Sequence, residues 1–372
     1  MSAEDELPEA DRADGALHPR HTPRLFGQEA AEDEFLSAFT GGRQHHAWLL
    51  TGPRGVGKAT LAWRMARFLL AEAPADAGLF GAAPAPSSLD VAGDHPVVRR
   101  VAALSDPGLL LIRRSWDHER KRLKSQITVD EVRKLNAFFG LSAAGGGRRV
   151  VIVDCADELN PSSANALLKV LEEPPARAIL ILTSHQPARL LPTIRSRCRM
   201  LRLKPLDAGA LSAALEQAGV AVEDDGSLAE LAGGSAGEAL RLANLDGPAL
   251  YERVVGLMRQ APNMDRQAAR AFVDTVTTRG AEERLALAVR LLDLALVRLA
   301  RTGAGMAPLH PAAKGETDAW AKLSLAASSR RWAELQQALS ARLGHGLAVN
   351  VDPASLLLDA LLQVNETARG VA

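Results

Sequence analysis

A glycine-rich stretch of the chain carries residue types that proteins use to hold phosphate groups. Residues 52–60 read GPRGVGKAT, close to the pattern G-x-x-x-x-G-K-[ST]. In that pattern the glycines let backbone N–H groups wrap phosphate oxygens, and the lysine, here Lys58, neutralises their charge. The closing hydroxyl should hold Mg²⁺, but the chain has Ala59 at that position. The stretch therefore predicts a vestigial site that holds ATP or ADP weakly and does not hydrolyse it.

A second candidate element is the apolar run 150–153, which ends in Asp154. A carboxylate at the end of such a strand can lie beside the phosphate loop and bind Mg²⁺ through water. An active ATPase of this layout has a glutamate next, to polarise the attacking water, whereas this chain has Cys155. The predicted nucleotide-binding residues are Gly52, Gly55, Gly57, Lys58, Thr60 and Asp154, and no metal-ligand set is predicted.

Three further polar residues lie close to these elements in the sequence. Thr60 stands one residue beyond the metal position and reaches the site only if the start of the following helix is distorted. Asp157 and Glu158 follow the aspartate by three and four residues. We interpret both as negative charges that complement the dipole at a helix start.

The elements that must position these residues alternate between strand and helix patterns. Short apolar runs typical of buried parallel strands occur at 47–51, 109–113, 149–154, 179–183 and 199–203. Helical patterns lie between them, notably at 57–71, 129–139 and 162–171. This alternation predicts an α/β fold with a five-stranded parallel sheet and helices on both of its faces.

After Pro205 the strand patterns stop and only helical patterns follow, the longer ones at 282–301 and 355–364. The first residues are polar, acidic and interrupted by proline, which is typical of a disordered tail. Residues 73–95 lack periodicity and predict a surface insertion. The predicted division is 1–22 disordered tail, 23–205 α/β domain, 206–246 small helical lid, and 247–372 all-helical C-terminal domain.

Composition limits the classes of partner and site. The chain has 44 Lys and Arg against 44 Asp and Glu, so any contact with DNA must come from a local patch. Its two cysteines, Cys155 and Cys198, cannot build a Cys₄ zinc site, and we expect no zinc. No apolar run is long enough to span a bilayer. We expect a cytoplasmic protein without membrane contact.

One local patch of positive charge lies at residues 113–124, which read RRSWDHERKRLK. Cations beside Trp116 are able to contact a phosphate backbone. Because Asp117 and Glu119 are interleaved with them, the same stretch is also typical of a solvated loop, which is the interpretation we favour.

Three motifs indicate a family. Residues 165–175 read NALLKVLEEPP, residues 190–198 read LLPTIRSRC, and residues 46–53 read HAWLLTGP. Together these motifs resemble the clamp-loader branch of the AAA+ superfamily, and within that branch the delta-prime family of bacterial DNA polymerase III. The motifs fall between residues 25 and 205. The resemblance implies an AAA+ P-loop domain followed by a helical lid and a helical oligomerisation, or collar, domain.

The resemblance implies a catalytic role in trans for Arg197, which lies in the triplet Ser-Arg-Cys. At this position the family has an arginine finger that reaches the ATP site of an adjacent subunit. A guanidinium near the γ-phosphate stabilises the charge that develops in phosphoryl transfer, an effect of about 10³–10⁵-fold in known cases. The alternative for Arg197 is a surface salt bridge.

The partners implied by the resemblance are the gamma/tau and delta subunits in a hetero-pentamer. Through that complex the chain would act on the sliding clamp and on primer-template DNA during replication. The chain departs from active relatives at Ala59, at Cys155, and at Gly237, where the lid of active relatives has an arginine. The four-cysteine zinc module of many relatives is also absent.

The departures at Ala59, Cys155 and Gly237 indicate a subunit without ATPase activity of its own, in a DNA-directed DNA polymerase (nucleotidyltransferase) holoenzyme, whereas the missing zinc module bears on zinc alone. Two alternatives remain. One is an active AAA+ motor, such as a gamma/tau-like subunit or a helicase loader. The other is a small-molecule P-loop kinase, which would leave the Ser-Arg-Cys triplet and the helical C-terminal region unexplained.

Overall fold

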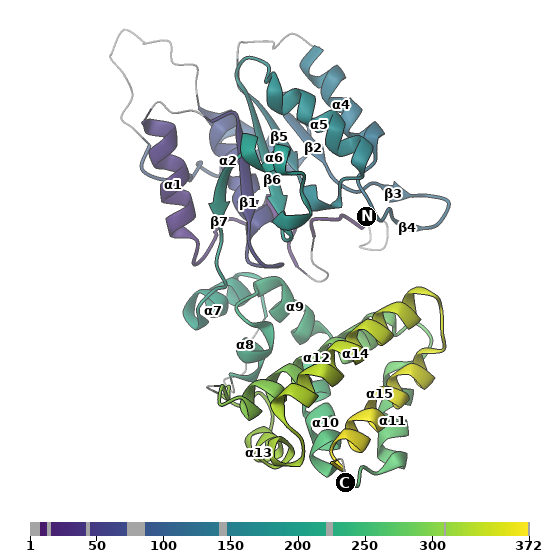
Figure 1. Cartoon of the computed structure of the whole chain (residues 1–372). Coiled ribbons are helices and arrows are strands. Elements are labelled where there is room, and N and C mark those ends of the chain that lie inside the picture. Colours follow the sequence, from purple (N-terminus) through teal and green to yellow (C-terminus); the bar gives the residue numbers. More distant parts are fainter. Residues whose placement is uncertain are drawn as a thin grey trace. The chain divides into compact units, whose positions relative to one another are not determined.

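The computed structural model describes residues 8–12, 16–41, 45–72, 86–140, 147–220, 226–308 and 310–370. Contacts divide the chain into two units, which are described separately. The α/β unit comprises Met1–Gly219 and Gly234–Glu238, and the helical unit comprises Val220–Gly233 and Ala239–Ala372 (Figure 1). Residues 206–246, predicted as a separate lid, are divided between the two units. The division into three domains therefore stays a prediction.

A five-stranded parallel sheet forms the centre of the α/β unit, as the strand patterns predicted. Its order is β2-β5-β6-β1-β7. The central strands are buried on both faces, which explains why they read as continuous apolar runs instead of alternating ones. The strands are β1 (Ala47–Thr51), β2 (Leu109–Ile112), β5 (Arg149–Val153), β6 (Ala178–Ser184) and β7 (Arg199–Arg202).

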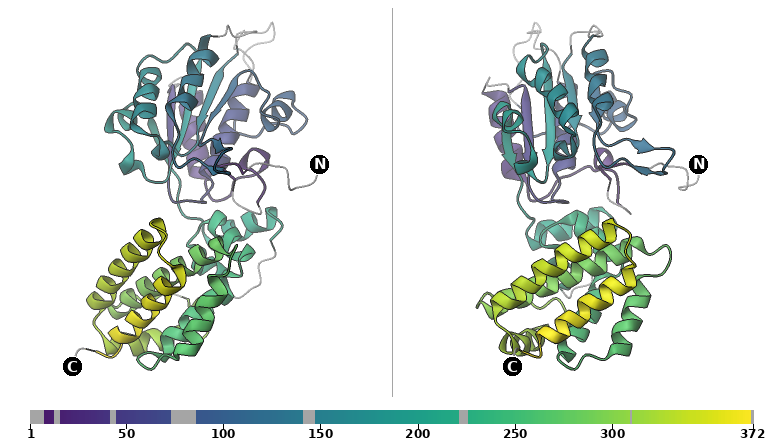
Figure 2. Two further views of the ribbon diagram at one scale, coloured as in Figure 1. Left: turned by 90° about the vertical axis from the view of Figure 1, so that its right-hand side faces the viewer. Right: turned by 45° about the vertical axis from the view of Figure 1, so that its right-hand side comes forward.

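Helices cover both faces of the sheet, as Figure 2 shows from two further directions. Side chains alternate along each strand, so Val150 and Ile152 pack in one core with α1, α2 and α3, while Val151 and Val153 pack in another with α4, α5 and α6. The helices are α1 (Glu29–Thr40), α2 (Lys58–Ala71), α3 (Pro96–Ala102), α4 (Val129–Gly140), α5 (Pro161–Glu172) and α6 (Pro192–Arg197).

Shorter elements complete this unit. An antiparallel hairpin, β3 (Trp116–Asp117) with β4 (Arg122–Leu123), follows β2. Helix α5 begins after Asn160, whose side chain accepts a hydrogen bond from Ser163 N at 2.8 Å. The remaining short elements are η1 (Pro19–His21), η2 (Ala156–Glu158), η3 (Pro187–Arg189), α7 (Ala208–Gln217), α8 (Ser227–Ala232) and α9 (Ala236–Asn244).

The N-terminal segment corrects one prediction. Residues 8–12 and 16–22 were expected in a disordered tail, yet Asp11 and His18 are buried. The Asp11 carboxylate pairs with Arg113 and lies 3.1 Å from His18 Nε2, and Glu9 pairs with Arg20 at 2.7 Å. The acidic residues are therefore matched by cations in the folded chain. This pairing could not be predicted from the composition of the segment, because acidic residues considered alone are typical of solvated charge.

The second unit is helical throughout residues 239–308 and 310–370, as predicted. Its two longest helices, α12 and α14, pack against each other (Figure 1). A buried carboxylate, Glu316, links three of the helices by accepting hydrogen bonds from Tyr251 Oη at 2.9 Å, Arg298 Nε at 2.6 Å and Trp320 Nε1 at 2.9 Å. The helices are α10 (Gly247–Gln260), α11 (Arg266–Val276), α12 (Glu282–Gly303), α13 (Glu316–Ala326), α14 (Ser329–Ala348) and α15 (Pro353–Thr367).

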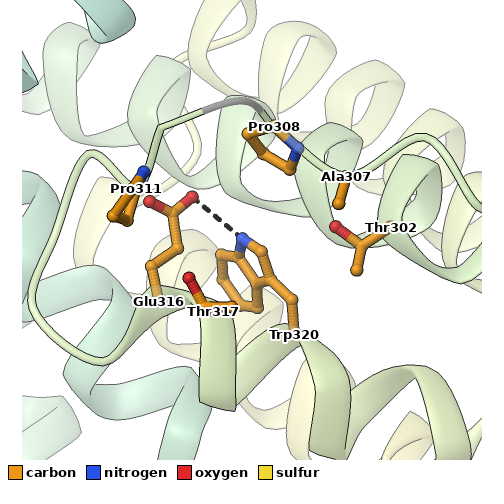
Figure 3. Close-up of a pocket in the computed structure, with 7 residues that line it drawn as sticks. All are labelled: Thr302, Ala307, Pro308, Pro311, Glu316, Thr317 and Trp320. Carbon is orange, nitrogen blue, oxygen red and sulfur yellow. Dashed lines mark hydrogen bonds between the residues drawn. The ribbon is translucent and has the colours of Figure 1, made fainter.

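A small pocket lies beside this carboxylate, and Figure 3 shows the seven residues that line it. Glu316 carries the charge among them. Its second oxygen, Oε2, accepts from Ala312 N at 2.5 Å, so both oxygens already have donors within the protein. The pocket wall is therefore a structural network that fixes the start of α13 instead of a set of groups open to a ligand.

The packed N-terminal segment predicts an acid-sensitive contribution to stability. Burial raises the pKa of Asp11, but His18 and Arg113 outweigh it and lower the pKa from 3.8 to about 2. A carboxyl with a lowered folded pKa stabilises the protein above about pH 5, and this stabilisation is lost as the pH falls toward 2. Replacing Asp11→Asn should therefore cost about 1–3 kcal/mol of unfolding free energy at pH 7 and almost nothing near pH 2.

Urea denaturation of the full chain across this pH range measures the difference. The matched control is Asp33→Asn, an exposed carboxylate of α1, which should leave the midpoint unchanged. A variant at Asp11 as stable as the wild type at pH 7 would show that the N-terminal segment contributes nothing to the fold.

Candidate functional site

The phosphate-loop candidate lies between the end of β1 and the start of α2, which is the context that its pattern requires. Three glycines have backbone φ angles that L side chains rarely adopt, +146° at Gly52, +72° at Gly55 and +100° at Gly57. Lys58 is the first residue of the helix. The loop therefore has the backbone that lets N–H groups converge on an anion.

Lys58 lies folded over its own loop. Its side chain is 7% exposed, and Nζ donates to the carbonyl oxygens of Gly52, at 2.9 Å, and of Pro53. Burial lowers the pKa of Lys58, while the neighbouring Asp154 opposes that shift. For Lys58 to bind a phosphate, it must exchange these two carbonyl contacts for the ligand.

The beginning of α9 lies directly against the loop. Gly237 N donates to Gly55 O at 3.1 Å, and a Cβ atom placed on Gly55 would lie 2.2 Å from Ser235 Oγ. A Cβ atom on Gly237 would in turn lie 3.0 Å from Gly55 Cα. Two glycines are therefore needed for this approach of backbone to backbone. Gly237 is the position at which the family resemblance implied an arginine in active relatives.

At the end of β5, Asp154 is held by hydrogen bonds. Thr183 Oγ1 donates to Asp154 Oδ1 at 2.8 Å, and the amide of Cys155 donates to Thr183 Oγ1, also at 2.8 Å. Burial raises the pKa of Asp154 from 3.8 to about 7, and the nearby Asp11 carboxylate adds to the effect. This shift favours the neutral carboxyl, which is a poor ligand for Mg²⁺.

Asp157 has a different role from the one predicted. Its Oδ1 accepts from His185 N at 3.2 Å, and its Oδ2 lies 3.3 Å from His185 Nε2, so it ties the loop after β5 to the end of β6. Cys155 Sγ lies 3.9 Å from His185 Nδ1, and burial strongly raises the pKa of that thiol. Sequence reasoning missed His185, because its pairing depends on knowing that β5 and β6 are neighbours.

Glu158 also differs from the prediction of a charge at a helix start. It pairs with Arg114 Nε at 2.6 Å and lies 3.6 Å from Arg54 Nη2, in the phosphate loop. The element that contains it, η2, has three residues and is a 3₁₀ turn with little dipole to complement. Both acidic residues therefore join neighbouring loops.

Thr60 lies in the first turn of α2 and makes no side-chain hydrogen bond to any residue that the structure describes. Successive helical residues project about 100° apart. Because α2 is regular from Lys58 onward, the side chain of Thr60 points in a different direction from that of Ala59. Its hydroxyl therefore does not replace the one that is missing at position 59.

Arg197 is the last residue of α6 and about a third of its side chain, 34%, is exposed. Its Nη2 lies 2.7 Å from Glu172 Oε1, at the end of α5, and its Nη1 donates to Thr193 O at 3.0 Å. A surface ion pair, one of the two predicted alternatives, is therefore present. It fixes the direction of the guanidinium and leaves part of it open to solvent.

The sheet separates Arg197 from the phosphate loop of its own chain. The loop follows the carboxyl end of β1, whereas Arg197 precedes the amino end of β7, and these strands are parallel neighbours with Trp48 opposite Arg199. The two sites therefore lie at opposite edges of the sheet, about 13 Å apart along β1 alone. The structure brings the loop, Lys58 and Asp154 together and leaves Arg197 outside that group.

Two wider searches of the described residues bear on other kinds of site. In that part of the chain no three or more His, Cys, Asp and Glu side chains are placed to hold a metal ion. Nor does any helix there combine the length and the apolar character needed to cross a bilayer.

Comparison with known proteins finds a family with similar sequences. Residues 27–207 match the family model described as DNA polymerase III, delta subunit. The DNA polymerase III subunit delta' of Pseudomonas aeruginosa is 42% identical over 217 residues, which cover 57% of this chain and 60% of that protein. The subunit delta' of Escherichia coli K12 is 34% identical over 173 residues, 46% of each chain.

Other relatives belong to the same holoenzyme. DNA polymerase III subunit gamma/tau of Mycobacterium tuberculosis is 33% identical over 217 residues, which cover 56% of this chain and 34% of that one. A solved gamma subunit-related protein from Thermotoga maritima covers 90% of this chain and 99% of its own, with 18% identity and a TM-score of 0.44, too low to add to the assignment.

The match spans less than two thirds of the length of each of these curated relatives. The family-model match, residues 27–207, contains the phosphate loop, the strand that ends in Asp154 and the triplet with Arg197. On this match and on the two delta' relatives, residues 27–207 of the chain are similar to the delta' subunits of DNA polymerase III.

Proposed function

We propose that the chain is a clamp-loader subunit that does not hydrolyse ATP itself and supplies Arg197 to the ATP site of an adjacent subunit. The observation that carries this proposal is the position of Arg197, at the edge of the sheet opposite its own phosphate loop. An arginine placed there cannot serve its own loop but is available to a neighbouring molecule. In that role its guanidinium stabilises the charge of the transferring γ-phosphoryl group.

Four features of its own loop support the lack of hydrolysis. Ala59 provides no hydroxyl for Mg²⁺, and Cys155 provides no carboxylate to orient water. Burial raises the pKa of Asp154, which disfavours the ionised form that binds Mg²⁺. Gly237 provides no side chain to contact a nucleotide, at the position where the resemblance implies an arginine in active relatives. These residues fit Mg²⁺–ATP poorly, so ATP or ADP would bind weakly if at all.

The assembly follows from the family resemblance. The gamma/tau and delta subunits are the proposed neighbours in a cytoplasmic hetero-pentamer, with the helical unit as the oligomerisation domain. ATP binding in the motor subunits would open the sliding clamp, and hydrolysis would release it on primed DNA. A subunit that does not change conformation with ATP binding and hydrolysis would occupy one end of such a ring.

An active motor of the gamma/tau type remains the second candidate, because a gamma/tau relative matches over 217 residues at 33% identity. The two candidates differ in one measurable property. A motor hydrolyses ATP in isolation or with DNA and clamp, whereas the proposed subunit does so only through its neighbour.

The first prediction concerns Arg197. In a reconstituted loader whose other ATP sites are inactivated, Arg197→Ala should lower DNA- and clamp-stimulated turnover at the adjacent site by about 10³-fold. The complex should still assemble in gel filtration. The control is Arg195→Ala, in the same helix, with no ion pair to any described residue. Unchanged turnover for the Arg197 variant would remove this residue from the mechanism.

The second prediction makes Glu172 a positioning residue. Its carboxylate holds Nη2 of Arg197 at 2.7 Å, so Glu172→Gln should lower kcat at the adjacent site by about 2–10-fold, with KM for ATP unchanged. In an Arg197→Ala background the same change should have no effect, since the residue acts only through Arg197.

Glu173→Gln is the matched control, because this neighbouring carboxylate is exposed and pairs with no described residue. An equal loss in both backgrounds would show that Glu172 supports the fold or the subunit contact instead of the guanidinium.

The third prediction concerns Asp154. An acid whose folded pKa is raised costs stability as the pH rises through the interval between its unfolded and folded values, here from about 4 to 7. Asp154→Asn retains an acceptor for Thr183 and removes this cost. The free energy of unfolding of the variant should therefore be about 1–3 kcal/mol higher than that of the wild type at pH 8, and equal to it near pH 4.

Thermal or urea denaturation across this range checks the prediction, with Asp94→Asn as an exposed control. A variant that is less stable than the wild type at pH 8 would mean that the carboxylate is needed ionised in the folded chain. In that case a bound cation at this site would again be worth testing.

A further inference from the structure

The basic hairpin, residues 113–124, is not used by the proposed function. It follows β2, contains β3 and β4, and extends away from the sheet of the α/β unit (Figure 1). The sequence left two interpretations open, a phosphate contact or a solvated loop. The structure separates its cations into two groups with different surroundings.

The cations at the base of the hairpin are neutralised. Arg113 pairs with Glu9 at 2.6 Å and with Asp11, and Arg114 pairs with Glu158 at 2.6 Å. These pairs fix the start of the hairpin to the N-terminal segment and to η2, and the Lys124 N to Ser115 O hydrogen bond at 2.9 Å joins its two arms. The base therefore anchors the hairpin, and its cations are already paired within the protein.

The cations of the outer part are unpaired. In the described part of the chain, Arg120, Lys121, Arg122 and Lys124 have no ion pair, and the first three are exposed. Asp117 lies among them: its Oδ1 accepts hydrogen bonds from Arg120 N and Glu119 N, both at 3.1 Å, and these bonds together with the charges of Arg120 and Lys124 lower its pKa, so it offsets part of the positive charge.

The loop at the tip is ordered by its own residues. The two bonds to Asp117 form its first turn, and Lys121 has a left-handed φ of +48° that completes the reversal into β4. Glu119, exposed at the tip, is a second opposing charge there. Four cations are thus displayed on a preformed loop against two carboxylates, Asp117 and Glu119, on a chain whose net charge is zero.

We propose that the outer part of the basic hairpin, Arg120, Lys121, Arg122 and Lys124, binds the phosphate backbone of DNA. Arg122 lies on β4 and Lys124 follows that strand directly, so the two cations are close together on one arm of the hairpin and can contact neighbouring phosphates. Trp116, opposite Leu123 in the hairpin and partly exposed, adds a flat surface beside them. Contacts of this kind carry no base sequence and strengthen binding at low salt.

The choice of DNA over another polyanion rests on the proposed function, while the existence of the cationic surface does not. A protein that acts at primed DNA needs sequence-independent contacts, and the neutral net charge of the chain means that such contacts must be local. The hairpin is a surface of this kind on the α/β unit.

The test measures binding of the full chain to a fluorescein-labelled primed duplex by anisotropy, between about 50 and 200 mM salt. The triple variant R120A/K121A/R122A should bind about ten-fold or more weakly, and its plot of log K against log salt should be shallower by about 2–3. R120K/R122K, which keeps the charge, should bind like the wild type. The matched control is R266A/R270A/R279A, three exposed arginines at or near α11 that pair with no described residue.

Several results would overturn the proposal. These are no detectable binding by the wild type at the lowest salt, a triple variant within about two-fold of the wild type, or an equal loss in the α11 control. Tighter binding of the hairpin to vesicles of anionic phosphatidylglycerol than to the duplex would assign the surface to a membrane instead. Circular dichroism of each variant checks that the fold is intact.

Failure here is distinguishable from failure of the proposed function. In the reconstituted loader at saturating DNA, the triple variant should retain the turnover that depends on Arg197. Weaker DNA binding by the triple variant, with the loss of turnover in Arg197→Ala unchanged, would support both proposals. Unchanged DNA binding by the triple variant, with that same loss of turnover, would overturn only the proposal for the hairpin.

Discussion

The parallel pairing of β1 with β7 is the constraint on which the rest of the α/β unit depends. Parallel strands send all their carboxyl ends to one edge of the sheet and all their amino ends to the other. The phosphate loop and Asp154 must therefore lie at one edge, and Arg197 at the other. No change of side chain can move the arginine to its own loop. If Arg197 serves an ATP site, as proposed, that site must therefore belong to another molecule.

Burial and internal pairing govern the electrostatics around the phosphate loop. Burial of Asp154 within reach of Asp11 and Glu158 favours the neutral carboxyl, and Lys58 is bound to carbonyl oxygens of its own loop. The acidic neighbours are themselves used, since Glu158 pairs with Arg114. Most charges around the loop are therefore paired within the chain, while Asp154 lacks a cation that forms an ion pair with it among the described residues.

The sheet and the loop could be predicted from sequence because buried parallel strands and glycine-rich turns have local patterns. The five apolar runs predicted all five strands of the sheet, and Gly52 to Lys58 were placed correctly between β1 and α2. The pairings of Asp157 with His185 and of Asp11 with Arg113 could not be predicted, because their partners lie 28 and 102 residues away and become neighbours only through the order of the strands. Acidic residues read alone look solvated, and only the fold shows which cation faces them.

The contact between Gly55 and Gly237 has a consequence for how the chain can change over evolutionary time. Losing the hydroxyl at Ala59 or the acid at Cys155 takes one substitution, and each could be reversed alone. Once two backbones touch, a larger residue at either glycine meets its neighbour at 3.0 Å or less. A larger side chain at position 237 would then require the start of α9 to move away from the loop. The contact therefore couples the two glycines, so that neither position can change unless the backbone between them moves as well.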